Sequence, residues 1–212
     1  MKNKIFIHVA TLNNYKEIVD GFICLIKSSG LFDIVEDIEI CINGDYQYFS
    51  PEHKVTINRV CDNYLSFEFP TLERIVEFCK SNNEYNILYL HTKGVSTPTT
   101  NKCVTDWVNY MLYFLVEKHD ECLKKLETHS CCGVDYTEEY SRHYSGNFWW
   151  ANSDYIKTLD YPRNLPLVLS ERHKAEFWIC SGEGKHHNMF SSNINILERH
   201  LTEFNESNYR MK

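Results

Sequence analysis

Apolar residues along the chain fall into short continuous runs and into stripes with helical spacing. The short runs, rich in β-branched and aromatic residues, predict strands over residues 4–10, 38–42, 54–59, 87–90, 131–136 and 147–151. The helical stripes predict helices over residues 14–27, 70–79, 105–128, 153–159 and 170–179. This alternation predicts an α/β fold with a central, mostly parallel sheet of about six strands and helices on both faces. Since no linker rich in Gly, Ser or Pro divides the chain, we expect a single domain over residues 1–212.

The strand at Ile87–Leu90 runs directly into the polar turn His91-Thr92-Lys93-Gly94. In open α/β sheets, ligands bind just outside the carboxyl ends of the strands. We therefore expect Lys93 to neutralise a phosphate group, and His91 to hydrogen-bond it or to bind a divalent metal. The alternative is an ordinary strand end followed by a solvated lysine.

A second unusual block is Ser145-Gly146-Asn147-Phe148-Trp149-Trp150. Adjacent tryptophans on a strand face opposite ways, so if one lies in the core the other must face a second layer or a cleft. The Ser-Gly-Asn turn offers a hydroxyl group, an amide and a close backbone approach. This combination is typical of a sugar site, and the alternative is a buried aromatic strand beside a turn.

Two carboxylates and one loop complete the candidate chemistry. Asp135 ends a predicted strand at the same edge as His91, and Glu176 precedes the apolar residues Phe177-Trp178-Ile179. On the same helix, Glu171 lies on a different face, so we expect Glu176 to face the cleft. The glycine-rich loop at residues 181–187 carries Lys185 and two histidines, which either close over phosphates or lie in solvent.

The overall composition is that of an ordinary globule, with 43% hydrophobic and 24% charged residues. The formal net charge is −7 and the basic residues are dispersed, so we expect no nucleic-acid partner. Motifs for dinucleotide binding (GxGxxG), for a P-loop, for a serine-hydrolase elbow (GxSxG) and for a zinc deaminase do not occur.

The nine cysteines are odd in number and irregularly spaced, which favours reduced, buried thiols in a reducing compartment. The spacing of His119, Cys122, His129, Cys131 and Cys132 matches no known zinc ribbon or finger. The most apolar stretch, residues 107–116, is too short to span a bilayer, and no secretory segment precedes the first strand. We therefore expect no transmembrane segment and a cytoplasmic location.

Taken together, these blocks resemble the glycosyltransferases of the GT-A fold. The resemblance rests on Ala10-Thr11-Leu12-Asn13 after the first strand, on "YLHTKG" at residues 89–94, and on residues 143–155 followed by residues 171–179. The last two blocks are similar to sugar transferases of bacteria and large DNA viruses, among them domains that glycosylate chlorella-virus capsids.

The resemblance implies transfer of a sugar, as in hexosyltransferases, from a UDP-sugar donor to a hydroxyl group of a glycan or glycoprotein acceptor. The implied nucleotide and diphosphate contacts are Thr11, Asn13, His91, Lys93 and Lys185. The implied sugar contacts are Ser145, Gly146, Asn147, Trp149 and Trp150. Glu176 and Asp135 become the candidate catalytic carboxylates.

The wider fold binds Mn²⁺ or Mg²⁺ through a D-x-D motif, for which His91 and His187 are the candidate ligands here. The chain contains no D-x-D, and His-Thr-Lys stands in its place. Lys93 is therefore expected to supply part of the neutralising charge. The alternative function is a sugar- or nucleotide-binding module without catalysis. The polar tail at residues 203–212 is expected to be a frayed end or the connection to a longer protein.

Overall fold

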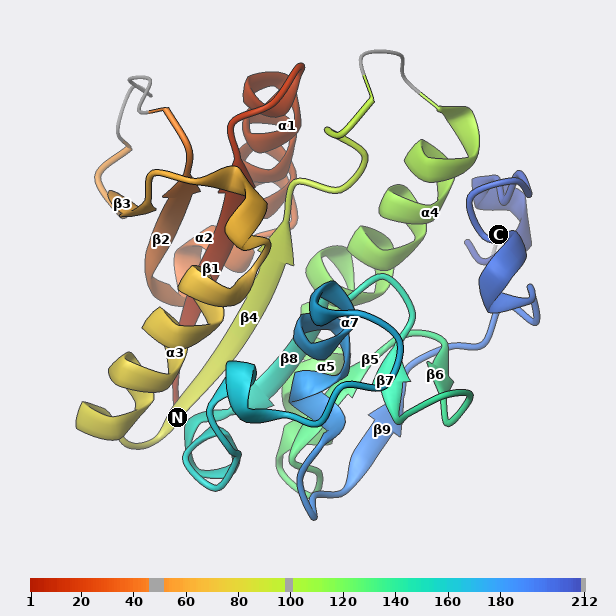
Figure 1. Cartoon of the computed structure of the whole chain (residues 1–212). Helices are drawn as coiled ribbons and strands as arrows, with labels where there is room; N and C mark the ends of the chain where they lie inside the picture. The colour runs from red at the N-terminus through yellow and green to blue at the C-terminus, as the bar shows by residue number, and fades with distance from the viewer. Residues whose placement is uncertain (46–51, 98–100, 211–212) are drawn as a thin grey trace.

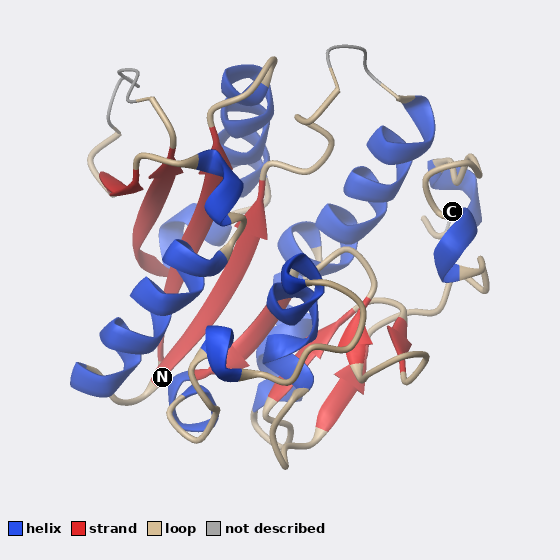
Figure 2. Ribbon diagram, in the orientation of Figure 1, coloured by secondary structure: helices blue, strands red, loops and turns tan. Residues whose placement is uncertain are grey.

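The computed structural model describes residues 1–45, 52–97 and 101–210, which form three layers, with helices on both sides of a sheet (Figures 1 and 2). Within these residues the central sheet has seven strands in the order β3-β2-β1-β4-β8-β5-β9. Their bounds are β1 Lys2–Ala10, β2 Val35–Asn43, β3 Val55–Cys61, β4 Tyr85–His91, β5 Cys131–Gly133, β8 Trp149–Asn152 and β9 His186–Asn188. A separate two-stranded sheet pairs β6 (Tyr136–Thr137) with β7 (His143–Tyr144).

The helices follow the strands as expected for an α/β fold. The α-helices are α1 Tyr15–Ser28, α2 Leu31–Ile34, α3 Phe69–Ser81, α4 Lys102–Leu112, α5 His119–Leu126, α6 Ser153–Ile156 and α7 Glu171–Phe177. The π-helical segment η2 (Tyr113–Glu117) joins α4 to α5. Short 3₁₀ turns are η1 Tyr64–Ser66, η3 Pro162–Asn164, η4 Trp178–Cys180, η5 Ile196–Glu198 and η6 Glu206–Asn208.

The sheet is mostly parallel, which confirms the prediction. β1 pairs in parallel with β2 and β4, β2 with β3, and β5 with β9, whereas β8 runs antiparallel to both β4 and β5. Because β8 lies between β4 and β5, these two strands point the same way. The carboxyl ends of β1, β4 and β5 therefore meet at one edge of the sheet.

Two hydrophobic cores lie on the two faces of the sheet. Alternate residues of β1 divide between them, since Ile5 and Ile7 pack toward α1, α4 and α5, whereas Phe6 packs toward α3 and α6. Strands covered on both faces are apolar throughout, as the continuous runs in the sequence indicate. Trp150 and Trp149 likewise face opposite cores, as predicted for neighbouring strand residues.

Several predicted boundaries change for local backbone reasons. The helix predicted over residues 105–128 begins at Lys102, because the Asn101 side chain accepts hydrogen bonds from the amides of Cys103 and Val104. It is also interrupted by η2. The strand predicted through Tyr136 stops at Gly133, because Asp135 has a positive φ of 49° and turns the chain away.

Two polar segments are more ordered than the sequence indicates. Part of the loop predicted over residues 181–187 forms β9, an edge strand of the sheet. The tail folds back, so that Phe204 and Tyr209 are buried against Tyr110, with ring centroids 5.2 and 5.3 Å away. Within the described residues, no helix combines the length and apolar character needed to cross a membrane.

Candidate functional site

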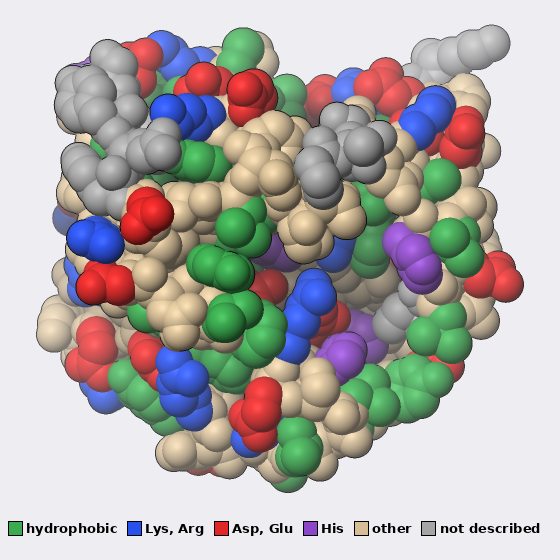
Figure 3. Space-filling model, turned by 45° about the horizontal axis from the view of Figure 1, so that its top comes forward, with side chains coloured by type: hydrophobic (Ala, Val, Ile, Leu, Met, Phe, Trp, Pro, Cys, Tyr) green, Lys and Arg blue, Asp and Glu red, His purple; other side chains and the backbone are tan. Residues whose placement is uncertain are grey.

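A cavity of about 960 Å³ opens beyond the carboxyl end of β4. It is bounded by α1, by α4, by the turn after β4, by residues 140–146 and by α7, with Leu197 and His200 at one side. A hollow in this face is visible in Figure 3, with acidic, basic and histidine side chains gathered around it. The volume lies in the range of pockets that bind small molecules and cofactors. Ile18, Phe22, Leu25, Val104, Val108 and Leu112 of α1 and α4 form an apolar wall.

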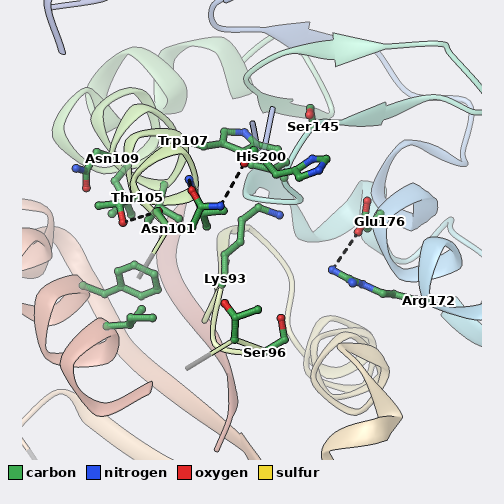
Figure 4. Close-up of a pocket in the computed structure, with 18 of the residues that line it drawn as sticks. Lys93, Ser96, Asn101, Thr105, Trp107, Asn109, Ser145, Arg172, Glu176 and His200 are labelled. Carbon is green, nitrogen blue, oxygen red and sulfur yellow. Dashed lines mark hydrogen bonds and ion pairs between the residues drawn. The ribbon is translucent and has the colours of Figure 1, made fainter. Parts of the chain in front are cut away.

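Lys93 projects into this cavity from the turn after β4 (Figure 4). The turn is fixed by Thr92, whose hydroxyl accepts a hydrogen bond from the Ala10 amide at 3.1 Å and whose amide donates to the His8 carbonyl at 3.0 Å. The Lys93 ammonium lies 4.0 Å from the centroid of the Trp107 ring. Burial lowers the pKa of Lys93, and the nearby Glu176 carboxylate opposes that shift. The result is a positive charge largely removed from water.

Arg172 and Glu176 face the cavity from α7. Four residues apart, they lie on the same side of the helix, with 3.7 Å between the Arg172 Nη2 and Glu176 Oε1 atoms. The Glu176 side chain is 21% exposed and that of Arg172 is 53% exposed. Lys93, Arg172 and Glu176 thus form a cluster with a net positive charge at one end of the cavity.

Beneath this cluster lies a layer of buried titratable groups. The His91 Nε2 atom is 3.0 Å from the Gly146 carbonyl oxygen, and its Nδ1 atom is 3.9 Å from a Glu68 carboxylate oxygen. Burial holds the pKa of His91 well below its usual value and raises the pKa of Glu68. The neutral imidazole must carry its proton on Nε2, because the Gly146 carbonyl can only accept. His143 also lines the cavity, and burial lowers its pKa as well.

Two buried polar atoms of the cavity wall have no hydrogen-bond partner within the described residues: the Ser145 hydroxyl oxygen and the Trp107 indole nitrogen. A buried polar group without a partner costs about 1–3 kcal/mol. Both atoms are buried within the wall, so a ligand in the cavity would pair with them only if the side chains of the wall moved.

The structure brings four of the predicted site residues to the cavity wall: Lys93, Ser145, Gly146 and Glu176. Gly146 has a φ of +99°, and a β-carbon there would lie 2.5 Å from the Met111 sulfur, so the close approach requires glycine. His91 lies just below the wall, as described above.

The prediction that Trp149 and Trp150 of β8 contact a sugar is wrong, because neither side chain reaches the cavity. Trp149 and Trp150 are fully buried, with their indole nitrogens donating to the Asn147 side-chain oxygen and to the Leu115 carbonyl. Asn147 is buried too. Helices cover both faces of the sheet, so both tryptophans meet a packed core, and neither ring is available to a sugar.

Asp135 and Lys185 lie away from the cavity lining. The Asp135 carboxylate pairs with Arg199, whose side chain is 1% exposed, and accepts a hydrogen bond from the Ser192 amide at 2.7 Å. Lys185 is exposed and directly precedes β9, which runs parallel to β5, so it lies at the sheet edge opposite Lys93. Neither residue is placed to contact a ligand in the cavity.

Thr11 and Asn13 lie at the same sheet edge as Lys93, but outside the cavity lining. The Thr11 amide donates to the Asn43 carbonyl at 3.1 Å, and the Asn13 side-chain amide donates to the Val95 carbonyl at 2.5 Å. Asn13 therefore joins the loop before α1 to the turn after β4, and both of these segments border the cavity. The contact of Thr11 and Asn13 with a nucleotide stays a prediction.

The residues present do not fit the divalent cation that the GT-A resemblance implies. Strands β8 and β5 separate His187 on β9 from His91 on β4, so about 14 Å lies between their backbones. They cannot share an ion. The Nε2 atom of His91 is occupied by a carbonyl, and a hard cation prefers several oxygen ligands. At the cavity end, two cationic side chains surround the Glu176 carboxylate instead.

Sequence reasoning did not find Arg172, His143 or Trp107 as site residues. A signal existed for Arg172, because it precedes Glu176 by one helical turn. His143 is the first residue of the block at residues 143–155. Knowledge of how the following turn folds would have been enough to place it at the site. Trp107 lies on a different helix, and no local pattern connects it to Lys93.

Residues 46–193 match the model of a family described as a domain of unknown function (DUF8361). The chain belongs to this family. The DUF8361 match includes β4, the turn with Lys93, α4 and α7, and so contains the charged end of the cavity. No curated protein gives a significant match to the chain.

Proposed function

We propose that this DUF8361 protein is a glycosyltransferase that moves a sugar from a nucleotide-sugar donor, a UDP-sugar in the first instance, to the hydroxyl group of a glycan acceptor. The observation that carries the proposal is the cluster of Lys93, Arg172 and Glu176 at one end of a cavity beyond the carboxyl end of β4. This position is the one that α/β sheets use for phosphate-containing ligands.

Breaking the anomeric C–O bond leaves negative charge on the departing diphosphate. Lys93 and Arg172 would stabilise that charge, and the burial of Lys93 strengthens its interaction because less water screens it. In this proposal the two cations take the role that a metal ion has in the wider fold. No step of it requires a divalent cation.

Positive charge grows on the sugar ring at the same time. Glu176 lies within reach of this end of the cavity and would either accept the proton of the acceptor hydroxyl or stabilise the reacting sugar. Ser145 and Gly146 line the cavity and would lie beside the sugar. Asp135 has no part in this mechanism, because Arg199 holds it elsewhere.

Calorimetric titration with UDP, UDP-sugars and free sugars, with and without EDTA, tests the proposal together with an assay for UDP-sugar hydrolysis. A transferase should bind UDP much better than a free sugar, hydrolyse one UDP-sugar slowly, and do both in EDTA. Binding of free sugars without UDP would instead identify a non-catalytic sugar-binding module. If UDP, GDP and CMP at millimolar concentration all fail to bind, the proposal is refuted.

A further inference from the structure

A second group of reactive side chains lies outside the cavity, on the face of the sheet that α3 and α6 cover. It consists of Cys131 on β5, Cys180 at the end of η4 and His186 on β9. One potential ligand atom from each of these residues lies within 4.8 Å of the other two. Both cysteines are fully buried, whereas His186 is half-buried. The group contains the soft sulfur and imidazole ligands that zinc prefers.

Sheet register creates this group. Cys131 and His186 are directly paired across the parallel strands β5 and β9, so their side chains share one face of the sheet. Cys132, the next residue along β5, faces the opposite core. Cys180 belongs to the same core as Cys131 and comes from the segment that follows α7.

Neighbouring tyrosines fix the orientation of the histidine and of one thiol. The Tyr155 hydroxyl donates to the Ile179 carbonyl at 2.8 Å and lies 3.1 Å from the His186 Nε2 atom. Because that hydroxyl proton is already used, Nε2 must donate, and Nδ1 keeps its lone pair for a metal. The Tyr144 hydroxyl donates to the Cys131 carbonyl at 3.2 Å and lies 3.5 Å from its sulfur.

The glycine-rich segment at residues 181–185 connects Cys180 to His186. A β-carbon on Gly184 would lie 2.5 Å from a Tyr155 ring carbon, and one on Gly182 would lie 2.5 Å from a Leu159 methyl carbon. The glycines therefore let the backbone pack directly on these side chains. The sequence analysis associated this glycine-rich loop with phosphates. In the structure, its glycines instead allow a short connection between the two potential ligands Cys180 and His186.

We infer that Cys131, Cys180 and His186 bind one Zn²⁺ ion, with a water molecule as the fourth ligand on the exposed side of His186. Tetrahedral zinc with Zn–S bonds of about 2.3 Å places two sulfurs about 3.8 Å apart, so the ligand atoms need to close by no more than about 1 Å. The ion would join β5, the edge strand β9 and the end of η4. It would thereby fasten α7, which precedes η4, without touching the cavity.

Zinc binding would also explain why the Cys131 and Cys180 thiols are buried next to each other. A bound Zn²⁺ replaces the thiol protons and leaves thiolates whose charge the ion neutralises.

The test is a zinc titration of the reduced, metal-free full-length chain in competition with a chromophoric chelator, with Co²⁺ absorption as a second probe of thiolate ligation. We expect one equivalent of Zn²⁺, a thiolate-to-cobalt charge-transfer band, and a melting temperature that rises with Zn²⁺. Cys180→Ser and His186→Gln should each weaken Zn²⁺ binding by more than about 100-fold. Loss of a residue that only hydrogen-bonds to a metal ligand costs up to about 100-fold, and loss of a ligand itself should cost more.

Cys132→Ala is the matched control, since this cysteine lies on the same strand, is equally buried and faces the other core. It should bind Zn²⁺ as the unmodified chain does. His186→Gln keeps the test decisive if Cys180→Ser does not fold, because His186 is half-buried on an edge strand. The inference is overturned if the unmodified chain binds no Zn²⁺, if both ligand variants retain it, or if Cys131 and Cys180 form a disulfide under reducing conditions.

Discussion

Replacing Lys93 by methionine should separate the stability of the fold from its affinity for nucleotide. Within the described residues Lys93 makes no ion pair within 4 Å, and its ammonium rests on the Trp107 ring at 4.0 Å. That contact contributes about 0.5–2 kcal/mol. Lys93 is only partly exposed, so its ammonium loses part of its hydration, and we expect the lysine to destabilise the folded chain when no anion is bound.

The pH dependence of this destabilisation follows from the direction of the pKa shift. Burial lowers the pKa of Lys93, so the folded chain holds the proton less tightly than the unfolded chain does. The resulting loss of stability is complete below the lowered pKa and vanishes only above the ordinary value of about 10.4. Lys93→Met should therefore leave the free energy of unfolding unchanged or raise it by about 1–2 kcal/mol.

The affinity for UDP should change in the opposite direction. A charge-assisted contact contributes about 1–3 kcal/mol, which corresponds to a loss of about 5- to 150-fold in affinity. The measurements are urea unfolding at pH 7 without nucleotide and calorimetric titration with UDP. Lys185→Met is the matched control, because Lys185 is exposed at the other edge of the sheet, and it should change neither quantity. A variant that is less stable by more than about 1 kcal/mol and binds UDP normally would refute this account of Lys93.

Three further outcomes are expected. Glu176→Gln should lower turnover by about 10²-fold or more with UDP affinity nearly intact, as for the loss of a positioned acid–base group, and full activity in steady-state assays would remove Glu176 from the mechanism. Asp135→Asn should instead destabilise the fold by about 3–5 kcal/mol in urea unfolding, because it leaves the buried Arg199 without its charge partner; a stability like that of the unmodified chain would show that the pair contributes little. Burial lowers the pKa of His8 to about 3, so the unfolded chain gains a proton below pH 6.5 that the folded chain does not. Stability should therefore fall toward pH 5 at up to about 1.4 kcal/mol per pH unit from this residue, and His8→Asn should reduce that slope in unfolding curves measured at pH 7 and pH 5.

The sequence by itself determined the alternation of strands and helices and the strand end at which the candidate site lies. Continuous apolar runs predict strands buried on both faces, and the polar turn after Leu90 marks a strand end that faces the ligand edge of a parallel sheet. Local patterns of this kind depend on neighbours within a few residues. Helical spacing likewise put Glu171 and Glu176 on different faces, and the apolar residues that follow Glu176 selected it as the carboxylate facing the cleft.

Only the tertiary structure decided which distant residues meet. Asp135 looked like a partner for His91 because both end strands at one edge, yet its positive φ turns the chain toward Arg199. His187 on β9 cannot share a metal ion with His91 on β4, because β8 and β5 lie between these strands. The order of strands in a sheet cannot be predicted from local periodicity. The register that places Cys131 beside His186 has the same origin. Contacts between residues far apart in sequence depend on how whole elements pack, so their chemistry becomes visible only once strand order, register and helix layers are known.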